Sequence, residues 1–248
     1  MIRYFKLKWF VVKTMNIRYS FLEITRGKKP SDSWWSIVFI NPLSYVLIYF
    51  FANYFRVRHE LITALSLILG LFAAVFYYLG DRLDLAVAAT LFLLSVVFDS
   101  VDGKLAKLTQ TRSRFGRILD VARDKIVQVA CVLGLALGQT RASGDLDFIL
   151  LGGLYLFFSF ANLLISHQMS GSWSSSKALE KLQPIRIFGQ SAYPIPTVAE
   201  WTFLLFVFFP VLGNVKLGFY SALSMVGFSI IFLGKEFLSI KRAVRKSI

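Results

Sequence analysis

The stretch "FDSVDGKLAKLTQTRSRFGRILDVARDKIV" (residues 98–127) places four aspartates between two apolar segments. These acids are Asp99, Asp102, Asp120 and Asp124. The segments "LAVAATLFLLSVV" (85–97) and "VQVACVLGLALG" (127–138) on either side contain no charged side chain. Ionisable groups next to a hydrocarbon environment are costly to bury, and they mark functional sites in membrane proteins. The sequence therefore predicts a functional site at the junction of two membrane helices.

The composition indicates a membrane protein around this junction. The chain has 248 residues, of which 56% are hydrophobic. Apolar runs close to the ~20 residues that cross a bilayer as a helix occur at 61–80, 85–99, 126–138, 148–166, 198–212 and 217–233. These runs are continuous rather than alternating, which favours helices over a barrel. We therefore expect an all-α integral membrane protein with six transmembrane helices.

The segment "DSWWSIVFINPLSYVLIYFFANYF" (32–55) precedes the first of these runs. Trp34 and Trp35 are typical of the aromatic belt at a membrane interface, and Asn41-Pro42 interrupts the helical pattern. We expect an interfacial amphipathic helix here. A seventh span would move the N-terminus to the other side of the membrane and destroy the charge asymmetry of the connecting segments.

The charge distribution predicts the orientation. With a cytoplasmic N-terminus, segments 1–60, 104–125, 167–197 and 234–248 are cytoplasmic and carry 25 of the 28 Lys and Arg residues. The opposite side holds only Arg82, Arg141 and Lys216. This asymmetry is the positive-inside pattern, and it requires an even number of spans. The site would thus lie on the cytoplasmic face of a bacterial inner membrane or its equivalent.

The net charge of +14 has anionic membrane lipids as its expected partner. We expect no nucleic-acid binding, because that would require basic residues clustered on a folded soluble face. The domain organisation follows from the same pattern. We expect a basic cytoplasmic N-terminal arm at 1–31, a membrane domain at 32–240 and a basic cytoplasmic tail at 241–248.

The spacing of the acids predicts a metal site. Separations of three and four residues place each pair on one helix face, and a connection of about ten residues (104–113) lets the two pairs face each other. Four carboxylates that close need compensating charge, and an all-oxygen ligand set favours Mg²⁺, Mn²⁺ or Ca²⁺. Ion pairs with Lys104, Lys107, Arg117 or Arg123 are the alternative, which would explain one such acid better than four.

Residues 99–124 read D-x2-D-G-x2-A-K-x8-G-x3-D-x3-D. This pattern resembles the signature of the CDP-alcohol phosphotransferases, which has arginine at the position of Lys107. Lysine keeps the charge but loses the bidentate fork of arginine. The family also has a Pro-Asn-x-x-Thr pattern at the first span. The present chain keeps Thr63 there but has His59 and Glu60 in place of Pro-Asn.

The resemblance implies transfer of a phosphatidyl or other substituted phosphate group from a CDP-linked donor to an alcohol or phospho-alcohol, with release of CMP. The donor that the resemblance implies is CDP-diacylglycerol. Asp99, Asp102 and Asp120 would hold two divalent ions, Mg²⁺ or Mn²⁺. Asp124 would complete the metal shell or act as general base. The residues implied around the CMP moiety are Gly103, Ala106, Lys107 and Gly116, with Thr63 a weaker candidate.

The acceptor stays open at this point. A phosphorylated acceptor would need cations, for which Arg114, Lys125 and Arg186 are candidates. A homodimer is implied only by the resemblance. Two other functions would use the same acids, namely a divalent-cation transporter and a catalytically silent membrane partner. A transporter would place its acids near the bilayer midplane on discontinuous helices, whereas these acids lie at helix ends.

Overall fold

The computed structural model describes residues 19–26, 32–55, 59–110, 114–172, 185–187, 190–192 and 197–246. Its helices are α1 (Phe21–Arg26), α2 (Asn41–Phe50), α3 (His59–Leu79), α4 (Arg82–Leu108), α5 (Arg114–Ser143), α6 (Asp147–Ser172), α8 (Val198–Phe203), α9 (Phe209–Val211) and α10 (Val215–Lys246). Three π-helical turns are η1 (Ser36–Ile40), η2 (Phe51–Phe55) and η3 (Leu204–Phe208). The strands β1 (Ile185–Ile187) and β2 (Gln190–Ala192) form a short antiparallel hairpin.

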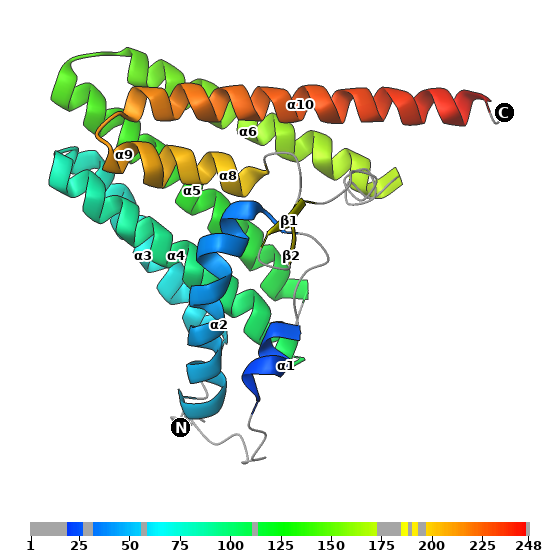
Figure 1. The fold of residues 1–248 in the computed structure, drawn as a ribbon. Coiled ribbons are helices and arrows are strands. Elements are labelled where there is room, and N and C mark those ends of the chain that lie inside the picture. Colours follow the sequence, from blue (N-terminus) through cyan, green and yellow to red (C-terminus); the bar gives the residue numbers. More distant parts are fainter. Residues whose placement is uncertain are drawn as a thin grey trace, which may run out of the picture.

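Helices α3, α4 and α5 form one layer, and α6 runs beside α10 (Figure 1). The turn between α3 and α4 contains Gly80 with a φ of +83°, a conformation that glycine adopts without steric cost. Buried aromatic side chains pack between helices α3, α4 and α5 and the helices that follow them in the chain. Tyr77, Tyr155 and Phe219 are fully buried there, and the hydroxyl of Tyr77 donates a hydrogen bond to the carbonyl oxygen of Phe206. This core holds α3 and α5 against the later helices.

Helix α5 approaches α3 through two glycines one turn apart. A Cβ atom at Gly134 would overlap the carbonyl oxygen of Ala74, and one at Gly138 would overlap that of Tyr77. Small residues at this spacing let helix backbones pack closely in membranes, where dispersion contacts replace the hydrophobic effect as the driving force. The close contact fixes the axis of α5, whose N-terminal half carries two of the four acids.

The segment before α3 is one helical rod made of η1, α2 and η2. Asn41-Pro42 was expected to interrupt this helix, and the structure shows a continuous one in which Pro42 stands in the first turn of α2, directly after η1. Proline has no backbone N–H group to donate to the preceding turn. The π-helical hydrogen bonding before Pro42 lets the helix continue without that donor. The rod packs against α4, and the Trp35 ring stacks on Phe203 of α8 with ring centroids 3.4 Å apart.

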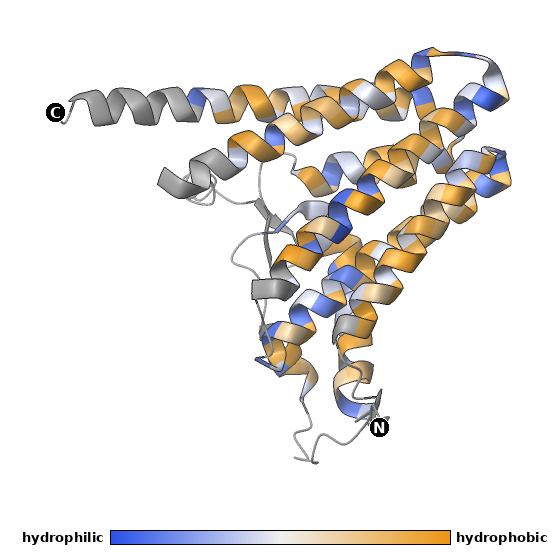
Figure 2. Cartoon of the chain, turned by 180° about the vertical axis from the view of Figure 1, so that it is seen from behind, coloured by the Kyte–Doolittle hydropathy of each residue, from blue (hydrophilic) through white to orange (hydrophobic). Residues whose placement is uncertain are grey.

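The apolar runs predicted to cross the membrane coincide with helical segments to within a residue at their ends, so the predicted helical architecture is confirmed apart from the β1–β2 hairpin, whereas the count of six spans stays a prediction. Among the described residues, five helices are long and apolar enough to cross a membrane: Ser36–Tyr54, Leu61–Leu79, Arg82–Leu108, Asp147–Ser166 and Val215–Lys235. Figure 2 shows how apolar residues dominate these helices. The set includes the segment predicted to be interfacial. It omits α5, which is charged in its first turns, and the shorter apolar segment Val198–Val211.

Candidate active site

The four acids lie on two neighbouring helices. Asp99 and Asp102 are on α4, and Asp120 and Asp124 are on α5. The connection between these helices is shorter than the ten residues predicted, because α4 continues to Leu108. Leu105 and Ala106 are buried, and this packing extends the helix beyond the acids. Gln110, with a φ of +56°, then turns the chain away from the α4 axis.

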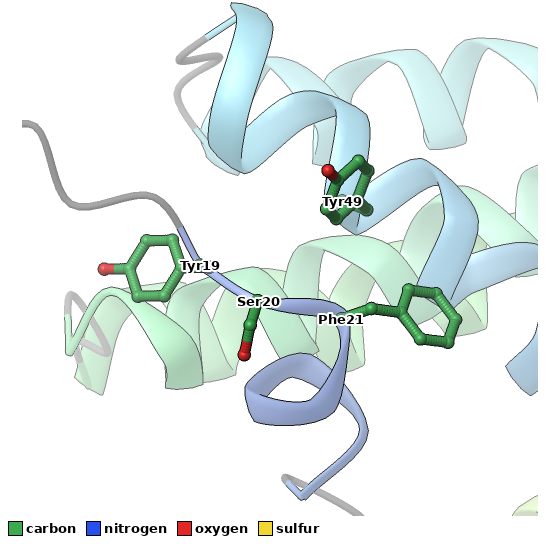
Figure 3. A pocket seen from close by; sticks show the side chains of 4 residues that line it. All are labelled: Tyr19, Ser20, Phe21 and Tyr49. Atoms are coloured by element: carbon green, nitrogen blue, oxygen red, sulfur yellow. The ribbon is translucent and has the colours of Figure 1, made fainter.

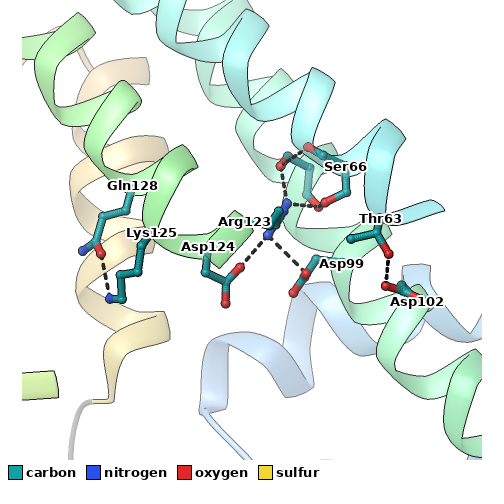
Figure 4. Close-up of polar contacts among 9 residues, drawn as sticks. Thr63, Ser66, Asp99, Asp102, Arg123, Asp124, Lys125 and Gln128 are labelled. Atoms are coloured by element: carbon teal, nitrogen blue, oxygen red, sulfur yellow. Dashed lines mark hydrogen bonds and ion pairs between the residues drawn. The ribbon is translucent and has the colours of Figure 1, made fainter. Parts of the chain in front are cut away.

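Asp99 and Asp124 meet at one nitrogen atom. Nη1 of Arg123 lies 3.2 Å from Oδ1 of Asp99 and 2.7 Å from Oδ1 of Asp124 (Figure 4). The arginine side chain is only 5% exposed, whereas the Asp99 and Asp124 side chains are 30% and 54% exposed. The two helices thus present carboxylates from opposite sides of a buried cation, with their accessible surface directed away from the core.

Asp102 and Asp120 are the other two acids on these helices. Asp102 is 4% exposed and accepts a hydrogen bond from the hydroxyl of Thr63, which brings the start of α3 to the acids. Asp120 is half-buried, one helical turn before Asp124. Asp99 interacts electrostatically with each of the other three acids. The predicted acids therefore share one electrostatic environment, and Thr63 belongs to it.

Arg123 was considered in the sequence only as an ion-pair partner, and the structure gives it a central place in the cluster. Its Nη2 donates to the carbonyl oxygen of Ser95 at 3.0 Å and to the hydroxyl of Ser95 at 2.6 Å. The available signal was its helical position. Arg123 lies on the same stripe of α5 as Val127 and Cys131, both of which are buried. A basic residue on such a stripe must find partners inside the bundle.

Lys125 points to a different part of the bundle. Its Nζ donates to Oε1 of Gln128 at 2.9 Å, and Gln128 in turn donates to the hydroxyl groups of Tyr155 and Ser159 on α6. Partial burial lowers the pKa of Lys125, while the neighbouring Asp124 acts in the opposite direction. The other two candidates for acceptor binding are Arg114, the first residue of α5, and Arg186 in β1, whose side chains lie outside the described part of the structure.

The residues expected around a nucleotide differ in their surroundings. Ala106 is buried, Lys107 is exposed, and Gly103 and Gly116 are half-buried. A Cβ atom at Gly103 would meet no atom of the described residues within 4 Å. Close approach of another backbone therefore does not explain this glycine.

Comparisons with known proteins fit this arrangement of acids. The sequence profile of the CDP-alcohol phosphatidyltransferases matches residues 58–232, which include all four acids and Thr63. The chain belongs to this family. Its resemblance to the family signature is thereby confirmed.

Two relatives show how far the similarity extends. An archaetidylinositol phosphate synthase from Pyrococcus horikoshii is 28% identical over 95 residues, which cover 38% of this chain and 48% of the relative. A protein of Aquifex aeolicus described as uncharacterized is 36% identical over 115 residues, covering 46% of this chain and 56% of the relative. The chain thus matches about half the length of each of these relatives.

The oxygen atoms of the four aspartates are suitable ligands for a hard divalent cation. Carboxylate oxygens such as those of Asp99, Asp102, Asp120 and Asp124 are the ligands that Mg²⁺ and Mn²⁺ prefer. Within the described residues, no three His, Cys, Asp or Glu side chains are close enough together to form a ready metal centre. Asp99 and Asp124 instead share Arg123, so these carboxylates are balanced by a protein cation.

A separate pocket lies far along the rod that precedes the family match. It is lined by Tyr19, Ser20, Phe21 and Tyr49, where the chain entering α1 approaches α2 (Figure 3). None of the four acids contributes to its wall. The acids of α4 and α5, and not this pocket, therefore form the candidate active site.

Proposed function

We propose that this CDP-alcohol phosphatidyltransferase moves a phosphatidyl or other substituted phosphate group from a CDP-linked donor, CDP-diacylglycerol in the first place, to an alcohol or phospho-alcohol, with release of CMP. The observation that carries the proposal is the convergence of Asp99 and Asp124 from two helices on one buried nitrogen, with Asp102 and Asp120 beside them. Family membership supports the reaction class.

Asp99, Asp102, Asp120 and Asp124 would hold two divalent ions, Mg²⁺ or Mn²⁺. Bound there, these ions would offset the negative charge that develops on a pyrophosphate during phosphoryl transfer. Thr63 donates its hydroxyl proton to Asp102 and so restrains that carboxylate. Asp124 is the most exposed acid of the Arg123 pair. This exposure supports a role as the general base, which must reach the hydroxyl group of the acceptor.

The nucleotide would lie along the outer side of α4. Gly103 provides space next to Asp102, and exposed Lys107 provides a positive charge one helical turn further on. Ala106 lies between them on a buried face, and Gly116 stands near the start of α5. A pyrophosphate carries several negative charges, so Lys107 would contribute a charge-assisted hydrogen bond to it.

For the acceptor we infer a phosphorylated alcohol. The printed name of the Pyrococcus horikoshii relative supports this class. Lys125, which follows the proposed base directly in α5 and donates to Gln128, is a candidate for binding the phosphate of the acceptor. Arg114 and Arg186 would add positive charge for the phosphate of the acceptor. A free phosphate group on the acceptor requires such cations, whereas a neutral alcohol does not.

The membrane arrangement that completes the proposal is the one predicted from charge. Six spans, a preceding interfacial helix at 32–55 and a cytoplasmic active site would let the donor keep its acyl chains in lipid while its nucleotide reaches water. The arm at 1–31, the membrane domain at 32–240 and the tail at 241–248 are part of this proposal, as is a homodimer. The cytoplasmic excess of Lys and Arg supports the orientation.

The proposal is tested with the purified full-length protein in lipid nanodiscs containing CDP-diacylglycerol. We expect CMP release only when Mg²⁺ or Mn²⁺ and a suitable acceptor are present, and mass spectrometry of the lipid products across a panel of alcohols and phospho-alcohols identifies the acceptor. Product formed only with unphosphorylated alcohols would refute the inferred acceptor class. CMP release without any divalent cation would refute the metal-dependent reaction.

Asp124→Asn gives the sharpest single variant. It removes the proposed base while keeping the size of the side chain, so we expect CMP release to fall at least ~100-fold, the usual contribution of a positioned base. Asp84→Asn is the matched control, because Asp84 lies in the first turn of α4 at the end remote from the acids. Undiminished turnover in Asp124→Asn would contradict the mechanism. Divalent-cation uptake into proteoliposomes without CMP release would favour a transporter, and neither activity would favour a silent membrane partner.

A further inference from the structure

Arg123 is a cation fixed at the meeting point of three helices. From α5 it reaches Ser95 on α4, and Ser95 is itself bound to Ser66 on α3. The two serines exchange hydrogen bonds, since each hydroxyl donates to the carbonyl oxygen of the other at 2.8 and 3.1 Å. Two bonds from Nη2 of Arg123 to Ser95, at 3.0 and 2.6 Å, attach the guanidinium group to this junction. The position of the guanidinium is therefore set by the helix packing.

The opposite edge of the same guanidinium faces the acids. Nη1 contacts Oδ1 of Asp124 at 2.7 Å and Oδ1 of Asp99 at 3.2 Å. Each contact uses one oxygen of its carboxylate, Oδ1, so Oδ2 of Asp99 and Oδ2 of Asp124 lie outside these ion pairs. Because the guanidinium is planar, fixing Nη2 on Ser95 also fixes the direction of Nη1. Arg123 thus orients one carboxylate from each of the two helices that carry the acids (Figure 4).

An arginine that only stabilised the bundle would not need contacts with one carboxylate from each of the two helices that carry the acids. A buried cation must be paired, but any acid would satisfy that need, and here both partners are acids of the family signature. The signature leaves position 123 unspecified, since this residue falls within the last D-x3-D spacer. Side chains that orient metal-binding carboxylates from behind commonly change metal affinity by 10- to 100-fold.

We propose that Arg123 is a positioning residue which orients Asp99 and Asp124 for a divalent cation, using the Ser66–Ser95 junction as its support. The inference rests on the proposed function, because it assumes that these acids receive the cation. Two effects of Arg123 oppose each other. Its charge repels an incoming cation, whereas the order it imposes on two carboxylates favours binding. The rigid attachment to Ser95 makes the second effect the larger one.

The test measures the affinity of Mn²⁺ for the purified full-length protein by electron paramagnetic resonance, together with thermal unfolding in the absence and presence of Mn²⁺. We expect Arg123→Gln to weaken Mn²⁺ binding by about 10- to 100-fold. Arg141→Gln is the matched control, because Arg141 is an exposed arginine near the far end of the same helix. Its Mn²⁺ affinity should equal that of the unmodified protein.

Two further variants keep the test decisive if Arg123→Gln folds poorly. Arg123→Lys retains the charge but not the fork that joins Ser95 to the acids, so we expect an intermediate loss of Mn²⁺ affinity. Ser95→Ala removes one support of the guanidinium without changing any charge, and it should also weaken Mn²⁺ binding. A purely structural role would lower thermal stability equally with and without Mn²⁺, and would leave the Mn²⁺ affinity of the folded protein unchanged.

The outcomes separate this inference from the proposed function. Unchanged or tighter Mn²⁺ binding in Arg123→Gln and Arg123→Lys would show that Arg123 only offsets charge, and would overturn the inference alone. Absence of Mn²⁺ binding by the unmodified protein would contradict the metal site of the proposed function, and the inference with it. Weaker binding in all three variants at Arg123 and Ser95, with normal binding in Arg141→Gln, would support the positioning role.

Discussion

Lys107 stands where the family signature has arginine, and its position in the structure makes the difference testable. It is exposed in the last turn of α4, one helical turn beyond Gly103. A lysine provides a point charge, whereas an arginine forms two parallel hydrogen bonds with a phosphate. The substitution therefore concerns how firmly a nucleotide donor is held, and not whether the site is positively charged at this point.

We expect Lys107→Gln to raise the KM for CDP-diacylglycerol by about tenfold, the effect of losing one charge-assisted hydrogen bond. Lys107→Arg should keep that KM at or below its original value. Steady-state kinetics of CMP release measure both, with Lys235→Gln as a control, since Lys235 is an exposed cation on α10. Equal KM values for all of these proteins would show that Lys107 does not contact the donor.

At the level of single residues, spacing predicted that the four acids share faces of two helices. Thr63 was only a candidate for the nucleotide pocket, through the family resemblance, and its hydrogen bond to Asp102 was not predicted. Helical periodicity determines which face of a helix each residue occupies, and the short side chains of the acids stay close to that face. Arg123 could not be assigned in this way. Its long side chain selects between several acids and carbonyl oxygens, and only the packing of α3, α4 and α5 brings Ser95 within its reach.

The contact between α3 and α5 is the element on which the site depends most. Gly134 and Gly138 allow the two backbones to touch, so the direction in which α5 carries Asp120 and Asp124 is determined by a contact well away from them. A side chain at either glycine would push the helices apart. Steric overlap with a backbone carbonyl group cannot be relieved by a change of rotamer.

We expect Gly134→Ala to lower the free energy of unfolding by about 1–3 kcal/mol, as overpacking of a close contact does. Gly153→Ala is the matched control on α6, where a Cβ atom would meet nothing within 4 Å. There the higher helix propensity of alanine should leave stability unchanged or slightly increased. Thermal unfolding in detergent measures both variants. A Gly134→Ala protein as stable as the Gly153→Ala protein would contradict the close packing of α3 and α5.

The helices themselves followed from the apolar runs, but their ends did not. The predicted connection at 104–113 would end the helix of the first two acids just after Asp102, while α4 extends to Leu108 because Leu105 and Ala106 find a buried environment. Similarly, Pro42 suggested a break, and a preceding π-helical turn absorbs it instead. In both cases tertiary packing decided a question that local sequence preference left open.

At the scale of the whole molecule, an ionic contact closes the bundle at the end opposite the acids. Nζ of Lys216, at the start of α10, lies 2.6 Å from Asp145 and 2.7 Å from Asp147, which flank the start of α6. The hydrogen bond from Lys216 and one from the backbone of Asp147 hold the pKa of Asp145 below its usual value. The folded protein therefore binds fewer protons at Asp145 than the unfolded chain does.

We expect this contact to stabilise the protein fully above about pH 4, the ordinary range of an aspartate, and to be lost as the pH falls through the lowered pKa. Thermal midpoints of the unmodified protein and Lys216→Met, measured between pH 7 and pH 3, test this. The difference between them should be small, because the pair is exposed, and should shrink on acidification. A difference that stays constant, or grows, at low pH would contradict the assignment.

The membrane topology was the least predictable feature at this scale. Length and apolarity select five helices among the described residues, including Ser36–Tyr54 and excluding α5. Sequence reasoning based on charge asymmetry instead counted the apolar half of α5 and the segment at 198–212 as spans. Helices buried within a bundle and helices exposed to lipid have similar compositions. Hydropathy therefore locates the helices of this chain without deciding which of them cross the bilayer.

The family match starts at residue 58, but the contacts that support the acid motif start earlier. Nζ of Lys104, the residue after Gly103, donates to Asn41 at 2.6 Å and lies over the ring of Tyr45. Trp35, the residue before η1, stacks on the ring of Phe203 in α8. A polypeptide cut at the homology boundary would keep every signature residue and still lose the neighbours of the motif, so truncations of this enzyme have to begin upstream of residue 32.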